Sequence, residues 1–247
     1  MCSISRLCRN EARPAPPAVR AFTLLELLVV IAIMGLLAAM LLAPLARAKE
    51  TAKRTRCGSN LHQIGLAFAL YSSDQGDCLP NTGDPFLWMG RHWRWVVQPY
   101  LPFSGAEIAA SNPDLSTNFS PGVLICPSDP GALTNYDGTS YGYTAASYFS
   151  DASINAMTIG DLYQSNSFPC LSRRAAAVRF PAQKGLVAEW LSAHAAIQVD
   201  WWDWRGKRQY AFIDGHVSYL AASAIRPAQD NLPDINLTVD GLSGRDL

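Results

Sequence analysis

A single carboxylate stands at the front of an almost wholly apolar segment. Glu26 lies in the run AFTLLELLVV (residues 21–30), and the next charged residue is Arg47. An ionised side chain within a bilayer costs roughly 2.5–3.5 kcal/mol, so it usually needs a partner. A cut between Ala21 and Phe22 would free an amine about one helical turn before Glu26. In a packed bundle of helices, the amine of one subunit could pair with Glu26 of the next and set their axial register. Alternatively, Glu26 sits at headgroup level, or acts as an acidic residue near a helix N-terminus.

The six cysteines are the other residues that could do chemistry, because an even number of cysteines can form disulfides. Cys2 and Cys8 precede the apolar segment and would be lost with a cleaved leader. The remaining four allow three disulfide pairings, which the sequence does not distinguish. No C-x-x-C occurs and no Cys/His spacing is typical of zinc, so we predict structural disulfides and no metal ion. The candidates are Cys57, Cys78, Cys126 and Cys170.

The histidines do not predict catalysis. A hydrolase needs a histidine beside a nucleophile and an orienting acid. Glu189, His194 and Asp200 are close in sequence, but a solvated loop is the simpler interpretation, and we expect His216 to cap a turn. We therefore predict that the chain is not an enzyme.

Basic clusters flank the apolar segment on both sides. Its 20 residues from 27 to 46 carry no charge and, at about 1.5 Å per residue, match the roughly 30 Å hydrocarbon layer. Three interpretations compete: a signal peptide cut after Ala46-Arg47-Ala48, an uncleaved anchor, and a cut before the segment. The third gives Glu26 a partner, the amine that the cut would free. The flanking bases are Arg6, Arg9, Arg13 and Arg20 before the segment, and Arg47, Lys49, Lys53, Arg54 and Arg56 after it.

The basic leader, the small residue and the run FTLLELLVVIAIMGLLAAM together resemble the N-terminal signal of type IV prepilins and type II secretion pseudopilins. The resemblance implies that prepilin peptidase removes residues 1–21, that Phe22 becomes the N-methylated mature N-terminus, and that Glu26 is the assembly glutamate. The family usually has Gly before the cut, where this chain has Ala21. Some pseudopilins bind calcium in a C-terminal loop, which makes calcium a candidate cofactor here, with Asp137, Asp200, Asp203 and Asp214 as oxygen ligands.

Two further segments resemble bacterial prepilin-like proteins with a C-terminal Asp-Gly motif. The first is CGSNLHQIGLA, beginning at Cys57. The second is Asp214-Gly215-His216-Val217, which matches the end of a motif that begins with His, ten positions before the Asp. Trp204 occupies that His position, so no role for the His carries over.

The elements that position these residues follow from periodicity. After Pro44 a helical pattern resumes, with Leu61, Ile64 and Phe68 on one face. Beyond it, short apolar runs between Gly, Pro and Asp predict strands at residues 123–126, 141–149 and 185–191 and a hairpin at 208–220, where Asp214-Gly215 forms the turn. Residues 93–101 suit a short helix or strand. The predicted class is α+β, with a long helix on a small antiparallel-sheet head: leader 1–21, transmembrane helix 22–46, amphipathic extension 47–73 and head 74–247.

These features predict a structural subunit of a type II secretion pseudopilus or type IV pilus-like filament. Its partners would be prepilin peptidase, like or related pilin subunits and an inner-membrane assembly platform. The chain would cross the bacterial inner membrane once, with its head in the periplasm, and a net charge of zero gives no sign of nucleic-acid binding. The alternative is a membrane-anchored periplasmic binding module that never polymerises and binds glycans through Trp201, Trp202 and Trp204. Alternation along a strand would leave at least one of these exposed.

Overall fold

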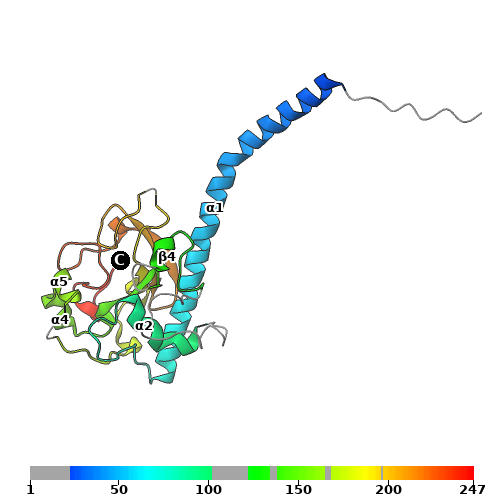
Figure 1. The fold of residues 1–247 in the computed structure, drawn as a ribbon. Helices are drawn as coiled ribbons and strands as arrows, with labels where there is room; N and C mark the ends of the chain where they lie inside the picture. Colours follow the sequence, from blue (N-terminus) through cyan, green and yellow to red (C-terminus); the bar gives the residue numbers. More distant parts are fainter. Residues whose placement is uncertain (1–22, 102–121, 134–137, 165–167, 196) are drawn as a thin grey trace, which may run out of the picture. The chain divides into compact units, whose positions relative to one another are not determined.

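The computed structural model describes residues 23–101, 122–133, 138–164, 168–195 and 197–247. The chain divides into two compact units, Met1–Ala46 and Arg47–Leu247, here called the N-terminal unit and the globular unit. One helix, α1 (Leu24–Asp74), runs through the boundary between them (Figure 1).

The N-terminal unit contains the apolar part of α1. The stretch is long and apolar enough, by length and composition, to cross a membrane, with a mean hydropathy of 2.7, and its large side chains are exposed. Pro44 lies inside the helix and does not end it. An exposed apolar helix near the N-terminus is consistent with membrane anchoring, because water is a poor solvent for such a surface.

The part of α1 in the globular unit is amphipathic, as the spacing predicts. Leu61, Ile64 and Phe68 are buried, whereas Leu66 and Leu70 are about half exposed. The Phe68 ring packs on Tyr143 of the sheet, with 4.8 Å between ring centroids. Burial of this stripe fixes which face of the helix meets the sheet.

Four antiparallel strands in the order β1-β2-β3-β4 form the sheet. Because each strand pairs with the next in sequence, the topology is a simple meander. At the β3–β4 turn, Gly215 has φ +90°, a conformation that side chains disfavour. The hairpin and the strand predicted at 185–191 are confirmed. The strands are β1 (Tyr141–Tyr143), β2 (Gly185–Glu189), β3 (Lys207–Phe212) and β4 (Val217–Ala221).

The prediction of a strand at residues 123–126 is wrong. These residues form turns, although Val123 and Leu124 are buried. Their backbone groups bond to single partners rather than to a ladder: Cys126 N donates to Ser140 Oγ at 2.9 Å, and the Ile125 carbonyl accepts from Asn60 Nδ2 at 3.1 Å. Burial and strand pairing are separate properties, and an apolar run reports only the first.

Other predicted boundaries shift in the same way. The strand expected over 141–149 stops at Tyr143, because the chain then turns into the 3-10 helix η4 (Ala145–Ser147). The segment at 93–101 is helical, with α2 (Gly90–Val97) followed by η1 (Gln98–Tyr100), where Pro99 suits a helix start.

Short helices complete the globular unit, and Figure 1 shows α4 (Asp151–Ala156) beside α5 (Ile159–Leu162). The architecture is α+β and pilin-like, with a long N-terminal helix and a four-stranded antiparallel sheet. The remaining described elements are the 3-10 helices η2 (Pro130–Leu133), η5 (Ala175–Ala177), η6 (Pro181–Gln183), η7 (Ala222–Ala224) and η8 (Gly241–Ser243).

Candidate functional site

Glu26 and Thr23 bond to each other at the start of α1. Glu26 Oε2 accepts from Thr23 N at 2.9 Å and from Thr23 Oγ1 at 2.8 Å, and Glu26 N donates back to Thr23 Oγ1 at 3.2 Å. This reciprocal pattern is a capping box, which satisfies backbone donors that a helix start leaves without partners. The predicted cleavage residues Ala21 and Phe22 lie outside the described residues, so their placement is not part of this geometry.

A disulfide between Cys57 and Cys126 fixes α1 to the loop before η2. The two residues are 69 positions apart with a Cα–Cα distance of 5.1 Å, and both are buried. It is one of the predicted bridges, whereas Cys78 and Cys170 are free and partly buried.

Asn60, one turn further along α1, holds the same loop. Its Nδ2 donates to the carbonyl oxygens of Gly122 and Ile125, both at 3.1 Å. The side chain therefore satisfies two acceptors in a segment without strand pairing. Asn60 is therefore a structural contact between α1 and the rest of the globular unit.

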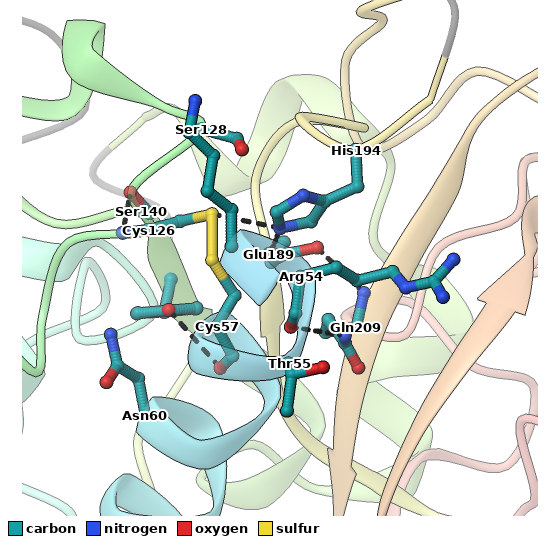
Figure 2. Close-up of polar contacts among 12 residues, drawn as sticks. Arg54, Thr55, Cys57, Asn60, Cys126, Ser128, Ser140, Glu189, His194 and Gln209 are labelled. Atoms are coloured by element: carbon teal, nitrogen blue, oxygen red, sulfur yellow. Dashed lines mark hydrogen bonds and ion pairs between the residues drawn. A yellow bond between two sulfur atoms is a disulfide. The ribbon is translucent and has the colours of Figure 1, made fainter. Parts of the chain in front are cut away.

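His194 lies between the disulfide and two carboxylates, those of Glu189 and Glu50. Figure 2 shows the ring beside Cys126 and Glu189. Its Nε2 is 3.1 Å from Cys126 Sγ and 3.4 Å from Glu189 Oε1, while Nδ1 is 2.8 Å from Glu50 Oε1. Ser128 Oγ also donates to Glu50 Oε1, at 3.0 Å. The imidazole thus joins three parts of the chain: α1, the Cys126 loop and the end of β2.

Burial and these contacts shift the pKa values of the cluster in different directions. Burial raises the pKa of Glu189 above its ordinary value, against the opposing effect of its hydrogen bonds. Burial lowers the pKa of His194, but its bonds to Glu189 and Glu50 outweigh this effect, and the pKa is raised overall. For Glu50, burial raises the pKa, but hydrogen bonds from His194 and Ser128 have the larger effect, and the pKa is lowered overall. The cluster therefore favours a charged imidazole beside Glu50.

The interpretation of Glu189 and His194 as a solvated loop is wrong. Glu189 ends the buried strand β2, and the His194 side chain has no exposed surface. Glu189 Oε2 accepts from Gln209 N at 2.8 Å, whereas Oε1 meets His194 Nε2 at the longer distance of 3.4 Å. The carboxylate within the apolar strand GLVAEWL was the one sequence feature that could have indicated a buried polar site.

Four side chains, those of Cys57, Cys126, Glu189 and His194, bring potential metal-ligand atoms within 4.8 Å of one another.

The predicted hairpin residues form a local turn. His216 Nδ1 lies 2.6 Å from Asp214 Oδ1, and its ring stacks on Phe212 at 4.3 Å between centroids. The Gly215 carbonyl is 3.2 Å from His62 Nδ1 on α1. The turn therefore touches the helix, and its side chains are occupied by structural contacts.

The acids named for calcium do not converge in the described structure. Asp203 binds Arg205, with Arg205 Nε 3.0 Å from Oδ1, and Asp214 faces His216. The Asp200 carbonyl accepts from the guanidinium of Arg208 at 3.1 Å. Asp137 lies outside the described residues, so calcium binding stays a prediction.

The tryptophan block contributes mainly to the core. Trp201 is buried and packs edge-on against Trp190 and Trp202, at 6.4 and 5.2 Å between centroids. Trp204 is 39% exposed, but the block lies in turns before β3 rather than in a strand, so the alternation expected from the sequence is not the cause.

The pentapeptide from Gly138 to Gly142, GTSYG, has the G-x-S-x-G spacing of a hydrolase nucleophile motif. Ser140 is only 1% exposed and its Oγ accepts from Cys126 N. The residue after it begins β1, whereas the motif needs a strand-to-helix turn. Ser140 is therefore a support for the disulfide loop.

Comparison with known protein families identifies the class. Residues 17–42 match the prokaryotic N-terminal methylation motif, which marks a pilin-like protein of the kind that prepilin peptidase processes. Residues 46–177, more than half of the chain, match the family described as "Protein of unknown function (DUF1559)", and the chain belongs to that family. No curated protein and no solved structure is significantly similar to the chain.

Proposed function

We propose that this protein is a structural subunit of a pseudopilus or type IV pilus-like filament. Its mature form would begin at Phe22, with the apolar part of α1 in the inner membrane before assembly and in the filament core afterwards. The globular unit would face the periplasm and contact neighbouring subunits. The role is mechanical rather than catalytic, and an assembly platform would supply the energy.

The observation that carries this proposal is the position of Glu26. It is the first residue with a charged side chain after the predicted cut, and 20 uncharged residues follow it. In one chain its carboxylate accepts hydrogen bonds from Thr23 through Oε2. A carboxylate in an apolar helix bundle is stabilised most by a full positive charge, which the Phe22 amine of a neighbouring subunit would supply. The capping box would hold the carboxylate at the height where that amine arrives.

Two matched substitutions separate pairing from capping. Glu26→Gln keeps an oxygen that can accept from Thr23 but removes the charge, and Thr23→Val removes the hydroxyl but keeps the carboxylate. We expect Glu26→Gln to abolish recovery of the subunit in the sheared filament fraction, with membrane levels unchanged, and Thr23→Val to reduce it only modestly. Equal recovery of Glu26→Gln and wild type would contradict assembly through this carboxylate.

A further inference from the structure

The buried cluster at the disulfide has the composition of a zinc site. Cys57 and Cys126 offer two sulfurs, His194 offers Nε2 and Glu189 offers Oε1, all within 4.8 Å of one another. Two thiolates, an imidazole and a carboxylate form a four-ligand set that suits a tetrahedral, borderline-soft divalent ion. Calcium and magnesium prefer oxygen ligands alone and fit this set poorly.

We propose that the chain with reduced cysteines binds one zinc ion through Cys57, Cys126, His194 and Glu189. The disulfide and the ion are mutually exclusive, because zinc binds thiolate sulfurs and a disulfide offers none. Cysteines are thiols in the reducing cytosol, where the chain is made, so the binding form exists before export. On binding, each thiol loses its proton to solvent and its sulfur bonds zinc. No electron transfer is involved.

The distances around His194 fit this assignment. Zinc bonds of about 2.0–2.3 Å in a tetrahedron place neighbouring ligand atoms roughly 3.3–3.8 Å apart. His194 Nε2 lies 3.4 Å from Glu189 Oε1 and 3.1 Å from Cys126 Sγ. The two sulfurs need to separate, and breaking their bond frees both side chains to rotate.

The outer contacts are those expected around a metal-binding histidine. A zinc-bound imidazole usually donates its second N–H to a carboxylate, which fixes the ring. Here Nδ1 faces Glu50 Oε1 at 2.8 Å, and Ser128 Oγ donates to the same oxygen at 3.0 Å. Glu50 and Ser128 are therefore positioning residues, and Nε2 is left to point at the sulfur (Figure 2).

Glu189 supplies the independent evidence for a ligand. The residue is almost completely buried, with one oxygen bonded to Gln209 N, while the other, Oε1, meets His194 Nε2 only at the long distance of 3.4 Å. A carboxylate oxygen with so long a contact is poorly satisfied, which is costly in a core. A metal ion beside it would satisfy that oxygen directly.

The test uses the full chain in detergent, with Cys2, Cys8, Cys78 and Cys170 changed to Ser so that only the cluster thiols remain. The protein is reduced with a phosphine and titrated anaerobically with Co²⁺, whose thiolate charge-transfer and tetrahedral d–d bands report the ligand set. We expect one equivalent to bind with both bands, and Zn²⁺ to displace it. Glu50→Ala should weaken binding about 10- to 100-fold while leaving the thiolate band in place.

Cys57→Ser and His194→Gln should each remove or alter the tetrahedral spectrum. In case these variants fold poorly, the thermal midpoint of the reduced background protein should rise with Zn²⁺ and stay unchanged with Mg²⁺. Absence of thiolate bands in the reduced protein, a spectrum unaltered by His194→Gln, or no thermal shift with Zn²⁺ would overturn the proposal. Each result is independent of filament assembly.

Discussion

Cys57 on α1 and Cys126 in the loop before η2 are joined by a disulfide that closes a loop of 69 sequence positions. The bridge fixes the amphipathic part of the helix to the rest of the globular unit. Because both sulfurs are buried, the link is part of the core rather than a surface staple.

Loss of this disulfide should lower the free energy of unfolding by about 4 kcal/mol, the value that chain entropy gives for a loop of this length. Cys57→Ala with Cys126→Ala, measured by urea unfolding in the presence of a chelator, tests this. All seven tryptophans lie in the globular unit, so their fluorescence reports its unfolding. The matched control, Cys78→Ala with Cys170→Ala, removes free thiols and should change stability little. Equal effects of the two pairs would contradict a structural disulfide.

Two glycines should respond to alanine with opposite signs. A Cβ on Gly142 in β1 would lie 2.7 Å from Trp190 Cη2, whereas one on Gly65 in α1 meets nothing within 4 Å. Gly142→Ala should destabilise by about 1–3 kcal/mol through overpacking. Gly65→Ala should stabilise by up to about 1 kcal/mol, because alanine is the better helix former. Thermal unfolding of both variants checks the pair, and stabilisation by Gly142→Ala would refute the packing described for the Trp190 ring.

Asp234 should make the globular unit less stable as pH rises. Its side chain is buried with Oδ1 accepting from Asn236 N at 2.7 Å, and burial raises its pKa to about 8. The folded state thus holds the proton more tightly than the unfolded state, whose pKa is about 3.9. Its contribution is complete below pH about 4 and is lost as pH rises towards 8.

The measurement is urea unfolding at several pH values between 5 and about 8.5, comparing wild type with Asp234→Asn. Each pH unit in this window should cost the wild type up to about 1.4 kcal/mol relative to the variant. The amide mimics the protonated carboxyl, so the variant should be the more stable protein at pH about 8. Parallel curves for the two proteins would show that Asp234 does not titrate in this window.

Much of the fold could be predicted because its determinants are local. The spacing of Leu61, Ile64 and Phe68 identifies the buried face of α1, and Asp214-Gly215 between alternating runs identifies the hairpin. Residues 123–126 show the limit of this reasoning. An apolar composition predicts burial, but whether the backbone pairs with a strand or with Asn60 and Ser140 depends on distant residues.

The buried cluster illustrates the same limit more strongly. Its members are far apart in the sequence, with 144 positions between Glu50 and His194. No local spacing relates these two residues to Cys57 and Cys126. The disulfide could be predicted as a class but not as a pair, because three pairings were equally compatible with the sequence. In contrast, the N-terminal motif is contiguous, and it was therefore recognisable from the residues alone.

The central claim concerns the new N-terminus, and mass spectrometry of the mature protein tests it most directly. Protein purified from its native membrane should yield an N-terminal peptide that begins at Phe22 and carries an N-methyl group. Ala21→Gly should leave this terminus unchanged, and a bulky residue at position 21 should block its formation. An intact arginine-rich leader, or a chain that begins at Lys49, would contradict the account.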